Sequence, residues 1–164
     1  MRAATFDRLI RRDLASLRRE VEAYPMDDEL WLTPPGVSNS TGVLVRHLCG
    51  NLRHYVGAVL GQSGYVRTRD AEFQAPPISR DQLLALIDDT EREVHPALAS
   101  LTDEQLSGDF PEPQNGRIYE APDYMTHLVM HLGYHLGQID YHRRLLTSSR
   151  GAVGALNSSD LPYR

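Results

Sequence analysis

Apolar residues recur every three or four positions in four separate stretches of the chain, and this is the period of an amphipathic α-helix. Local signals mark the helix ends. Pro25 and Gly61 follow the first two stretches, the capping-box pattern SRDQ opens the third, and Pro122 suits the first turn of the fourth. The pattern predicts helices over residues 5–24, 43–60, 79–98 and 122–146.

Four amphipathic helices of about twenty residues each are typical of a four-helix bundle. Strand signals are confined to the few residues around GRIYE. The connection of roughly seventeen residues between the second and third helices favours a crossover over a tight hairpin. We therefore predict an all-α four-helix bundle with a long crossover between helices two and three. It forms a single domain over residues 1–164, with a loop-like tail from about residue 147.

Composition narrows the classes of partner. The chain is 41% hydrophobic and has a formal net charge of −5 with no long basic run, so it offers no positive surface for nucleic acid or an anionic membrane. Charges throughout the N-terminal segment argue against a signal peptide, and no apolar run is long enough for a membrane span. The lone Cys49 cannot form an internal disulfide, which agrees with a reducing compartment. We expect a cytoplasmic protein that binds neither nucleic acid nor a membrane.

Four of the seven histidines fall within residues 127–142, in the sequence HLVMHLGYHLGQIDYH. Three of them, His127, His131 and His135, recur every fourth residue, which stacks side chains on successive turns of a helix. On a helical wheel centred on Leu128 in the core stripe, His135 lies about 20° away, His131 about 60° and His127 about 100°. His131 and His135 are therefore predicted to point inward together, with His127 at the edge of the face.

Distances along the helix axes narrow the set of metal ligands. His131 and His135 are about 6 Å apart, which one metal ion can bridge, whereas His127 and His135 are about 12 Å apart. On the second helix, His47 lies about 60° from the apolar stripe and His54 about 80°, so His47 is the better inward candidate. We predict a metal site of His47, His131 and His135 whose fourth position is open. Histidines that are hydrogen-bonded in the core or exposed on a solvated stripe are the alternative.

Three further polar residues lie near the predicted site. Asn51, one turn beyond His47, could orient a ligand histidine or hold substrate, and an Asn that satisfies a neighbouring backbone group is the alternative. Asp13, inside the stripe of the first helix, could accept the free N–H of a ligand histidine, and Gln138 flanks the site. Cys49 lies about 140° from the stripe of its helix, so we expect any reactive thiol to come from a cosubstrate.

The fourth helix carries a second apolar stripe on another side. It consists of Met130, Tyr134, Tyr141 and Leu145. A stripe that does not face the core of its own bundle is typical of a subunit interface. We therefore expect a homodimer, and a further core contact is the alternative.

Two segments, RHLCGNLRHYVG on the second helix and HLGYHLGQI on the fourth, resemble the DinB-like superfamily, which includes YfiT-type bacillithiol transferases and mycothiol-dependent maleylpyruvate isomerases. The helix pattern is similar across nearly the whole chain. The resemblance implies a four-helix bundle that binds a divalent metal through one histidine of helix two and two of helix four. These correspond to His47, His131 and His135. Many relatives have a second histidine directly after the last ligand, where this chain has Leu136.

The predicted site supports an enzyme or a binding protein. As an enzyme, the chain would use a divalent metal ion to lower the pKa of a low-molecular-weight thiol, of the bacillithiol or mycothiol type, which then attacks an electrophile. Zinc or nickel is the first expectation, with iron, manganese or copper as alternatives. The same open position would also permit hydrolysis by metal-activated water. Without catalysis, the ion would tie helix two to helix four in a dimeric stress-response protein.

Overall fold

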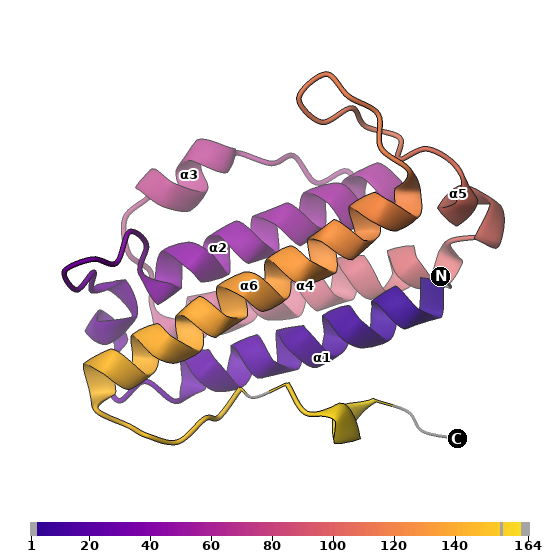
Figure 1. Ribbon diagram of the computed structural model, residues 1–164. Helices are drawn as coiled ribbons and strands as arrows, with labels where there is room; N and C mark the ends of the chain where they lie inside the picture. Colours follow the sequence, from indigo (N-terminus) through magenta and orange to yellow (C-terminus); the bar gives the residue numbers. More distant parts are fainter. Residues whose placement is uncertain (1–2, 155, 162–164) are drawn as a thin grey trace.

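Four long helices lie side by side in the computed structural model, which describes residues 3–154 and 156–161 (Figure 1). They are α1 (Ala3–Glu22), α2 (Thr41–Leu52), α4 (Arg80–Ser100) and α6 (Ala121–Thr147). Because α1 and α2 each pack against both α4 and α6, the four helices enclose one core. The described residues contain no β-strand, and the region around GRIYE forms only isolated bridges. The predicted all-α fold is confirmed.

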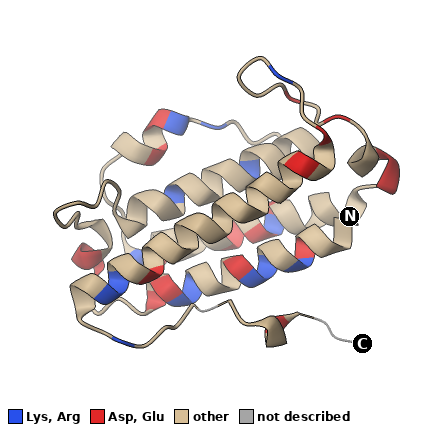
Figure 2. Cartoon of the chain, in the orientation of Figure 1, with Lys and Arg blue, Asp and Glu red and all other residues tan. Residues whose placement is uncertain are grey.

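Charged residues occur on all four long helices, but they are absent from the middle of α6 (Figure 2). Between Asp123 and Asp140, this helix has no Asp, Glu, Lys or Arg. Even so, no helix in the described part of the chain is both long enough and apolar enough to cross a membrane.

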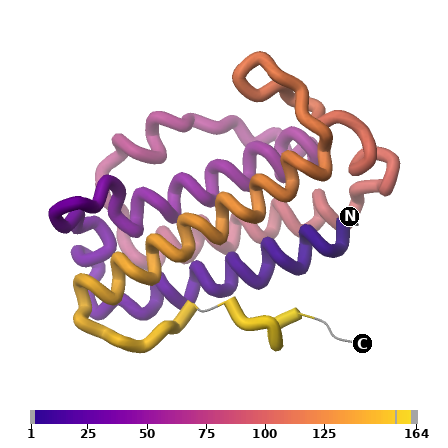
Figure 3. Tube along the Cα trace, viewed as in Figure 1, coloured from indigo at the N-terminus to yellow at the C-terminus, as the bar shows by residue number. Residues whose placement is uncertain are grey.

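The connection between α2 and α4 crosses back over α2, so that these two helices run in the same direction (Figure 1, Figure 3). This is the predicted crossover. It contains α3 (Arg69–Gln74), which packs on α2 and was not predicted because six residues are too few to show a helical period. The remaining short elements are η1 (Asp27–Trp31), α5 (Asp103–Ser107) and η3 (Ser158–Asp160).

The second helix changes type part-way along its length. The segment η2 (Arg53–Leu60), which follows α2 directly, is a π-helix, whereas the sequence predicted one continuous α-helix over residues 43–60. The wider π turn rotates the later residues relative to an α-helix. As a result, Val56 takes a fully buried position, and Tyr55 is left partly buried at the edge of a cavity.

The helix periods and caps otherwise agree with the sequence patterns. At the start of α4, the Ser79 hydroxyl accepts the N–H of Gln82, and the Gln82 side chain accepts the N–H of Ser79, so the predicted capping box is present. Each apolar stripe packs into the common core. The stripe of α1 consists of Phe6, Ile10, Leu14, Leu17 and Val21.

A buried ion pair joins α1, α6 and the C-terminal segment. Glu20 and Arg143 are 0% and 1% exposed, and Arg143 Nε donates to Glu20 Oε2 at 2.5 Å. The other carboxylate oxygen accepts the N–H of Gly154 at 2.9 Å, and Arg143 Nη2 donates to the carbonyl of Gly151 at 2.9 Å. Burial raises the pKa of Glu20, and the hydrogen bond from Arg143 opposes this effect. The two charges therefore depend on partners from three segments.

Removing the cation of this pair should destabilise the fold strongly. In Arg143→Met, Glu20 stays buried without its partner, so we expect the free energy of unfolding to fall by about 3 to 5 kcal/mol. Arg144→Met removes a more exposed arginine one position away and should cost less than about 1 kcal/mol. Chemical denaturation measures both changes. Equal losses would show that the buried pair has no special part in stability.

Candidate metal centre

Three imidazole rings from two neighbouring helices meet at one point. His47 projects from α2, and His131 and His135 project from successive turns of α6, which packs against α2. The Nε2 atom of His131 lies 3.2 Å from His47 Nε2 and 3.1 Å from His135 Nε2. Within residues 3–154 and 156–161, this is the only group of three or more His, Cys, Asp or Glu side chains with the spacing of metal ligands.

Hydrogen bonds on the far side of two rings decide where their protons lie. His47 Nδ1 is 2.9 Å from Glu72 Oε2, and His135 Nδ1 is 2.6 Å from Gln138 Oε1. Both of these oxygens accept hydrogen bonds, so each Nδ1 carries the proton and donates it. The Nε2 atoms of His47 and His135 therefore both present lone pairs to the shared point.

The third ring, His131, cannot donate a hydrogen bond to both of the facing nitrogen atoms. Burial and, to a smaller extent, the adjacent His135 and His47 lower its pKa to about 4, so the ring is neutral near pH 7. A single proton on His131 Nε2 could be donated to only one of the two facing lone pairs. Its Nδ1 atom is buried and has no hydrogen-bond partner among the described residues. Protein groups alone therefore leave a nitrogen unpaired at this point.

The arrangement fits a metal ion. Zinc binds histidine nitrogens at about 2.0 to 2.1 Å, which places the ligand atoms of a tetrahedral site roughly 3.3 Å apart. The observed separations of 3.1 and 3.2 Å are close to this value. Neutral imidazoles with free lone pairs are also the form that coordinates metals. The three histidines can therefore hold a metal ion.

Glu72 of α3 anchors the His47 ring. Its carboxylate is 7% exposed and accepts two hydrogen bonds from Arg67, at 2.6 Å from Nε and 2.9 Å from Nη2. Burial alone would raise the pKa of Glu72, but the bonds from Arg67 and His47 lower it below its usual value, so the group is ionised. A Cβ atom on Gly50 would lie 2.2 Å from Glu72 Oε1, so only glycine at that position lets the carboxylate reach α2.

A cavity of about 500 Å³ opens beside His47 and His131. Its wall includes the aromatic and polar side chains of Asn51, Tyr55, Arg67, Tyr119, Tyr124 and His127. No Cys, Ser, Thr or Lys from the described ranges lines it. The cavity can admit a small polar molecule, but the described chain brings no nucleophile of these types to it.

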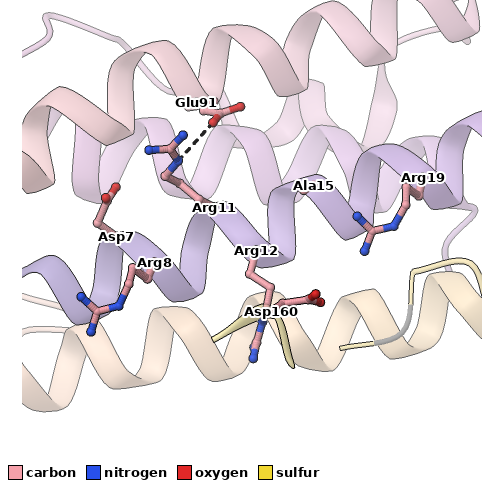
Figure 4. Close-up of a pocket in the computed structure, with 8 residues that line it drawn as sticks. All are labelled: Asp7, Arg8, Arg11, Arg12, Ala15, Arg19, Glu91 and Asp160. Carbon is pink, nitrogen blue, oxygen red and sulfur yellow. Dashed lines mark ion pairs between the residues drawn. The ribbon is translucent and has the colours of Figure 1, made fainter. Parts of the chain in front are cut away.

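A second cavity, of about 450 Å³, lies over α1 and has a different character (Figure 4). It is lined by several arginines, of which Arg11 pairs with Glu91 at 3.4 Å and Arg12 pairs with Asp13 at 2.8 Å. It contains no group of described side chains with the spacing of metal ligands. The histidine cluster is therefore the better candidate for chemistry.

The model of a family described as a protein of unknown function, DUF1572, matches residues 7–152, which include all three histidines. The chain belongs to the DUF1572 family. No curated protein matches it. Family membership therefore covers the bundle and the histidine cluster, and it assigns no reaction.

In this DUF1572 protein, the three polar residues predicted to support the site lie in different settings. Gln138 contacts the His135 ring, as described above. Asn51 lines the cavity at 8% exposure, and its buried Oδ1 atom has no partner among the described residues. Asp13 is buried and accepts a hydrogen bond from Arg12 at 2.8 Å, and no hydrogen bond in the described ranges links it to the cluster. Asp13 was expected to accept the free N–H of a ligand histidine, but Glu72 accepts that of His47 and Gln138 accepts that of His135.

Cys49 is 2% exposed, although the helical wheel placed it far from the core stripe. The wheel failed because α3, α4 and α6 all pack on α2, so nearly every side of this helix is buried. Burial raises the pKa of the Cys49 thiol to about 12, which keeps it protonated. It does not line the cavity beside the histidines, so a thiol supplied by a cosubstrate stays a prediction.

Two other histidines are satisfied within the fold. His142 Nε2 lies 2.8 Å from the carbonyl of Leu32, and His142 Nδ1 lies 2.7 Å from the Tyr24 hydroxyl. His54 Nε2 lies 3.1 Å from Glu112 Oε1. These two residues match the alternative of hydrogen-bonded histidines.

Sequence reasoning missed Glu72 and its partner Arg67. Both lie in the crossover, where no periodic pattern predicted structure, and the contact spans 25 positions from Glu72 to His47. One general signal was available, since histidines that bind metals usually donate their other N–H to a carboxylate. This rule does not identify which acidic residue of the chain supplies the carboxylate.

The neutral state of His131 should make the metal-free protein less stable in acid. Because folding lowers its pKa from 6.5 to about 4, the unfolded chain binds this proton first as the pH falls. Stability from His131 is therefore full above pH 6.5 and is lost toward pH 4. Between pH 6.5 and pH 4, we expect the free energy of unfolding of chelator-treated protein to fall by roughly 1 to 3 kcal/mol more than that of His131→Gln. Denaturant titrations across the range test this, and parallel profiles would contradict it.

Proposed function

We propose that the chain binds one divalent metal ion through His47, His131 and His135 and uses it to transfer a low-molecular-weight thiol to an electrophile. The observation that carries this proposal is the convergence of three Nε2 atoms beside an open polar cavity. Three protein ligands leave a coordination position for a substrate, as in catalytic sites, whereas structural sites are closed by four. The resemblance of both histidine segments to the DinB-like superfamily and its YfiT-type transferases supports the same assignment.

A bound divalent ion would supply a Lewis acid that lowers the pKa of a thiol entering the cavity. Zinc or nickel is the proposed metal, and iron, manganese and copper are alternatives that imidazole ligands also accept. The described cavity lining has no cysteine, so the thiol comes from a cosubstrate of the bacillithiol or mycothiol type. Such thiols stay reduced in the cytoplasm, which is the proposed location.

The surrounding side chains hold the imidazoles in the coordinating state. Glu72 and Gln138 accept the Nδ1–H groups of His47 and His135, which fixes the tautomer and the direction of each Nε2 lone pair. The Arg67 cation keeps Glu72 ionised and in place. His127 and the tyrosines border the cavity, where they exclude water from one side of the thiol and the electrophile.

Asn51 is the proposed acceptor for the third ligand. When His131 coordinates through Nε2, its Nδ1 must carry a proton, and that atom is buried without a described partner. Asn51 Oδ1 is a buried acceptor without a described donor, in the same cavity wall. α2 and α6 run in opposite directions (Figure 1), so the step from His47 to Asn51 along α2 follows the same direction as the step from His135 to His131 along α6. The two unpaired atoms are complementary.

Metal retention tests the ligand set. We expect one divalent ion per chain in protein purified without chelators, and loss of that ion in His131→Ala and His135→Ala. His127→Ala is the matched control, since His127 stands one turn from His131 on the same helix and is outside the cluster. Elemental analysis of each purified variant gives the answer. Retention in His135→Ala with loss in His127→Ala would exclude the proposed set.

Substitution of the residues that support the ligands should weaken metal binding without abolishing it. Glu72→Gln and Asn51→Leu leave all three ligands in place but remove the charge or the acceptor, so metal affinity should fall by about 10- to 100-fold. Asp70→Asn, on the same short helix as Glu72, serves as the control and should leave affinity unchanged. Unchanged affinity in both test variants would mean that these contacts do not orient the ligands.

Turnover distinguishes thiol transfer from its alternatives. With bacillithiol, mycothiol or cysteine and 1-chloro-2,4-dinitrobenzene, the thiol sulfur forms a bond to the ring carbon, chloride leaves, and the thiol proton passes to solvent. We expect thioether formation that chelation and His135→Ala both abolish and that Asp70→Asn, outside the cavity lining, retains. Ester hydrolysis in place of thioether formation would favour the hydrolase, and metal binding without turnover would favour a non-catalytic protein.

A further inference from the structure

One side of α6 exposes large apolar side chains that the monomer leaves uncovered. Met130 is 69% exposed, Tyr134 66%, Tyr141 65% and Leu145 66%. The opposite side of the helix is buried in the core. These four residues span a sector of about 60° on the helix. Met130 and Tyr134 lie in its uncharged stretch, and Tyr141 and Leu145 follow Asp140. We call them the α6 outer face, and apolar faces of this kind mark interaction surfaces.

The spacing along the α6 outer face is symmetric. The intervals between its four residues are 4, 7 and 4 positions. A two-fold axis between Gly137 and Gln138 therefore sets Met130 opposite Leu145 of the partner subunit and Tyr134 opposite Tyr141 of the partner subunit. An antiparallel copy of the same helix thus matches the face residue for residue, which is the requirement of a two-fold interface.

Two glycines beside the α6 outer face support close packing by another helix. A Cβ atom on Gly133 or Gly137 would meet no atom within 4 Å, so the monomer itself gives no packing reason for glycine there. Gly50 differs, because its Cβ would collide with Glu72. A glycine inside a helix costs about 1 kcal/mol relative to alanine. A second helix that approaches the backbone at the two-fold axis accounts for that loss.

The area of the α6 outer face reaches the lower limit for a specific interface. A buried tyrosine contributes about 150 to 250 Å². Together with Met130 and Leu145, the tyrosines on two copies would remove a total of roughly 1,000 Å² from water, which is the area that a specific interface must reach. The nearby cation Arg144 is paired with Asp140 at 3.2 Å, so its charge is balanced within the helix and does not favour an anionic membrane.

We propose that two copies of the chain associate through the α6 outer face, with antiparallel α6 helices crossing at Gly137, and that this contact supports the histidine cluster. Gln138 is exposed in the monomer, lies beside the axis and accepts the hydrogen bond from His135. Covering this side chain shields that hydrogen bond from water. The link to the histidine cluster rests on the proposed metal site, whereas the dimer itself does not.

Cross-linking between two single variants tests the geometry. Met130→Cys and Leu145→Cys are at exposed positions, and the native Cys49 is buried. A short bis-maleimide should join the two variants when they are mixed and should join neither variant to itself, because only unlike positions face each other across the axis. Light scattering of the unmodified protein should give the mass of two chains. A monomer, or self-linking of either variant as efficient as linking of the mixture, overturns the proposal.

The proposed effect of the dimer on metal binding is tested with a variant that leaves the three histidines unchanged. Tyr141→Glu combined with Leu145→Glu places like charges in the interface, six or more positions beyond His135, and should give a monomer. We expect the monomer to bind Co²⁺ about tenfold more weakly than the parent protein, with Met26→Glu, at another exposed apolar position, as the control. Equal affinity in monomer and parent overturns the link alone. Failure of the parent protein to bind Co²⁺ overturns the proposed function and leaves the cross-linking result intact.

Discussion

Two imidazole lone pairs held toward a third neutral ring are the constraint around which this bundle is arranged. Packing of α2 on α6 brings the Nε2 atoms of His47 and His135 to 3.2 and 3.1 Å from His131 Nε2, and acceptors behind His47 and His135 fix both of their protons on Nδ1. Burial keeps His131 neutral, so protonation does not relieve the contact near pH 7. Such a cluster is unfavourable for a purely structural core, because a leucine would fill the same space without an unpaired nitrogen.

The crossover between α2 and α4 supplies the groups that hold the His47 ring in this arrangement. It returns the chain over α2 and places α3 so that an ionised carboxylate reaches the His47 ring, while Arg67 from the same segment balances its charge. Gly50 leaves the space for that carboxylate on the α2 surface. A tight hairpin between α2 and α4 would have no chain in this position. The long connection therefore has a direct role in the site, beyond joining two helices.

Helical period predicted the fold class and the three histidines, because both follow from the 100° step and the 1.5 Å rise of an α-helix. The same arithmetic failed where a residue's surroundings depend on other segments. Cys49 is buried because three helices cover α2, and Glu72 reaches His47 through a crossover that has no periodic pattern. The π-helix of η2 also breaks the 100° step, so no wheel could place Tyr55 at the cavity. Local rules thus predicted the candidate ligands on regular helices, and contacts distant in sequence supplied the hydrogen-bond partners of these histidines.

The length of α6 lets one helix serve the core, the histidine cluster and the α6 outer face at once. Its inner stripe packs in the bundle, His131 and His135 lie at one edge of that stripe, and the exposed apolar residues occupy another side. Because all three sets share one rigid helix, they cannot rotate independently. A rotation that improved contact at the outer face would also move both histidines relative to His47. Gln138 joins the two regions directly, since it borders the outer face and fixes the proton of His135. The geometry of the histidine cluster is therefore tied to the surface that lies on the outside of the bundle.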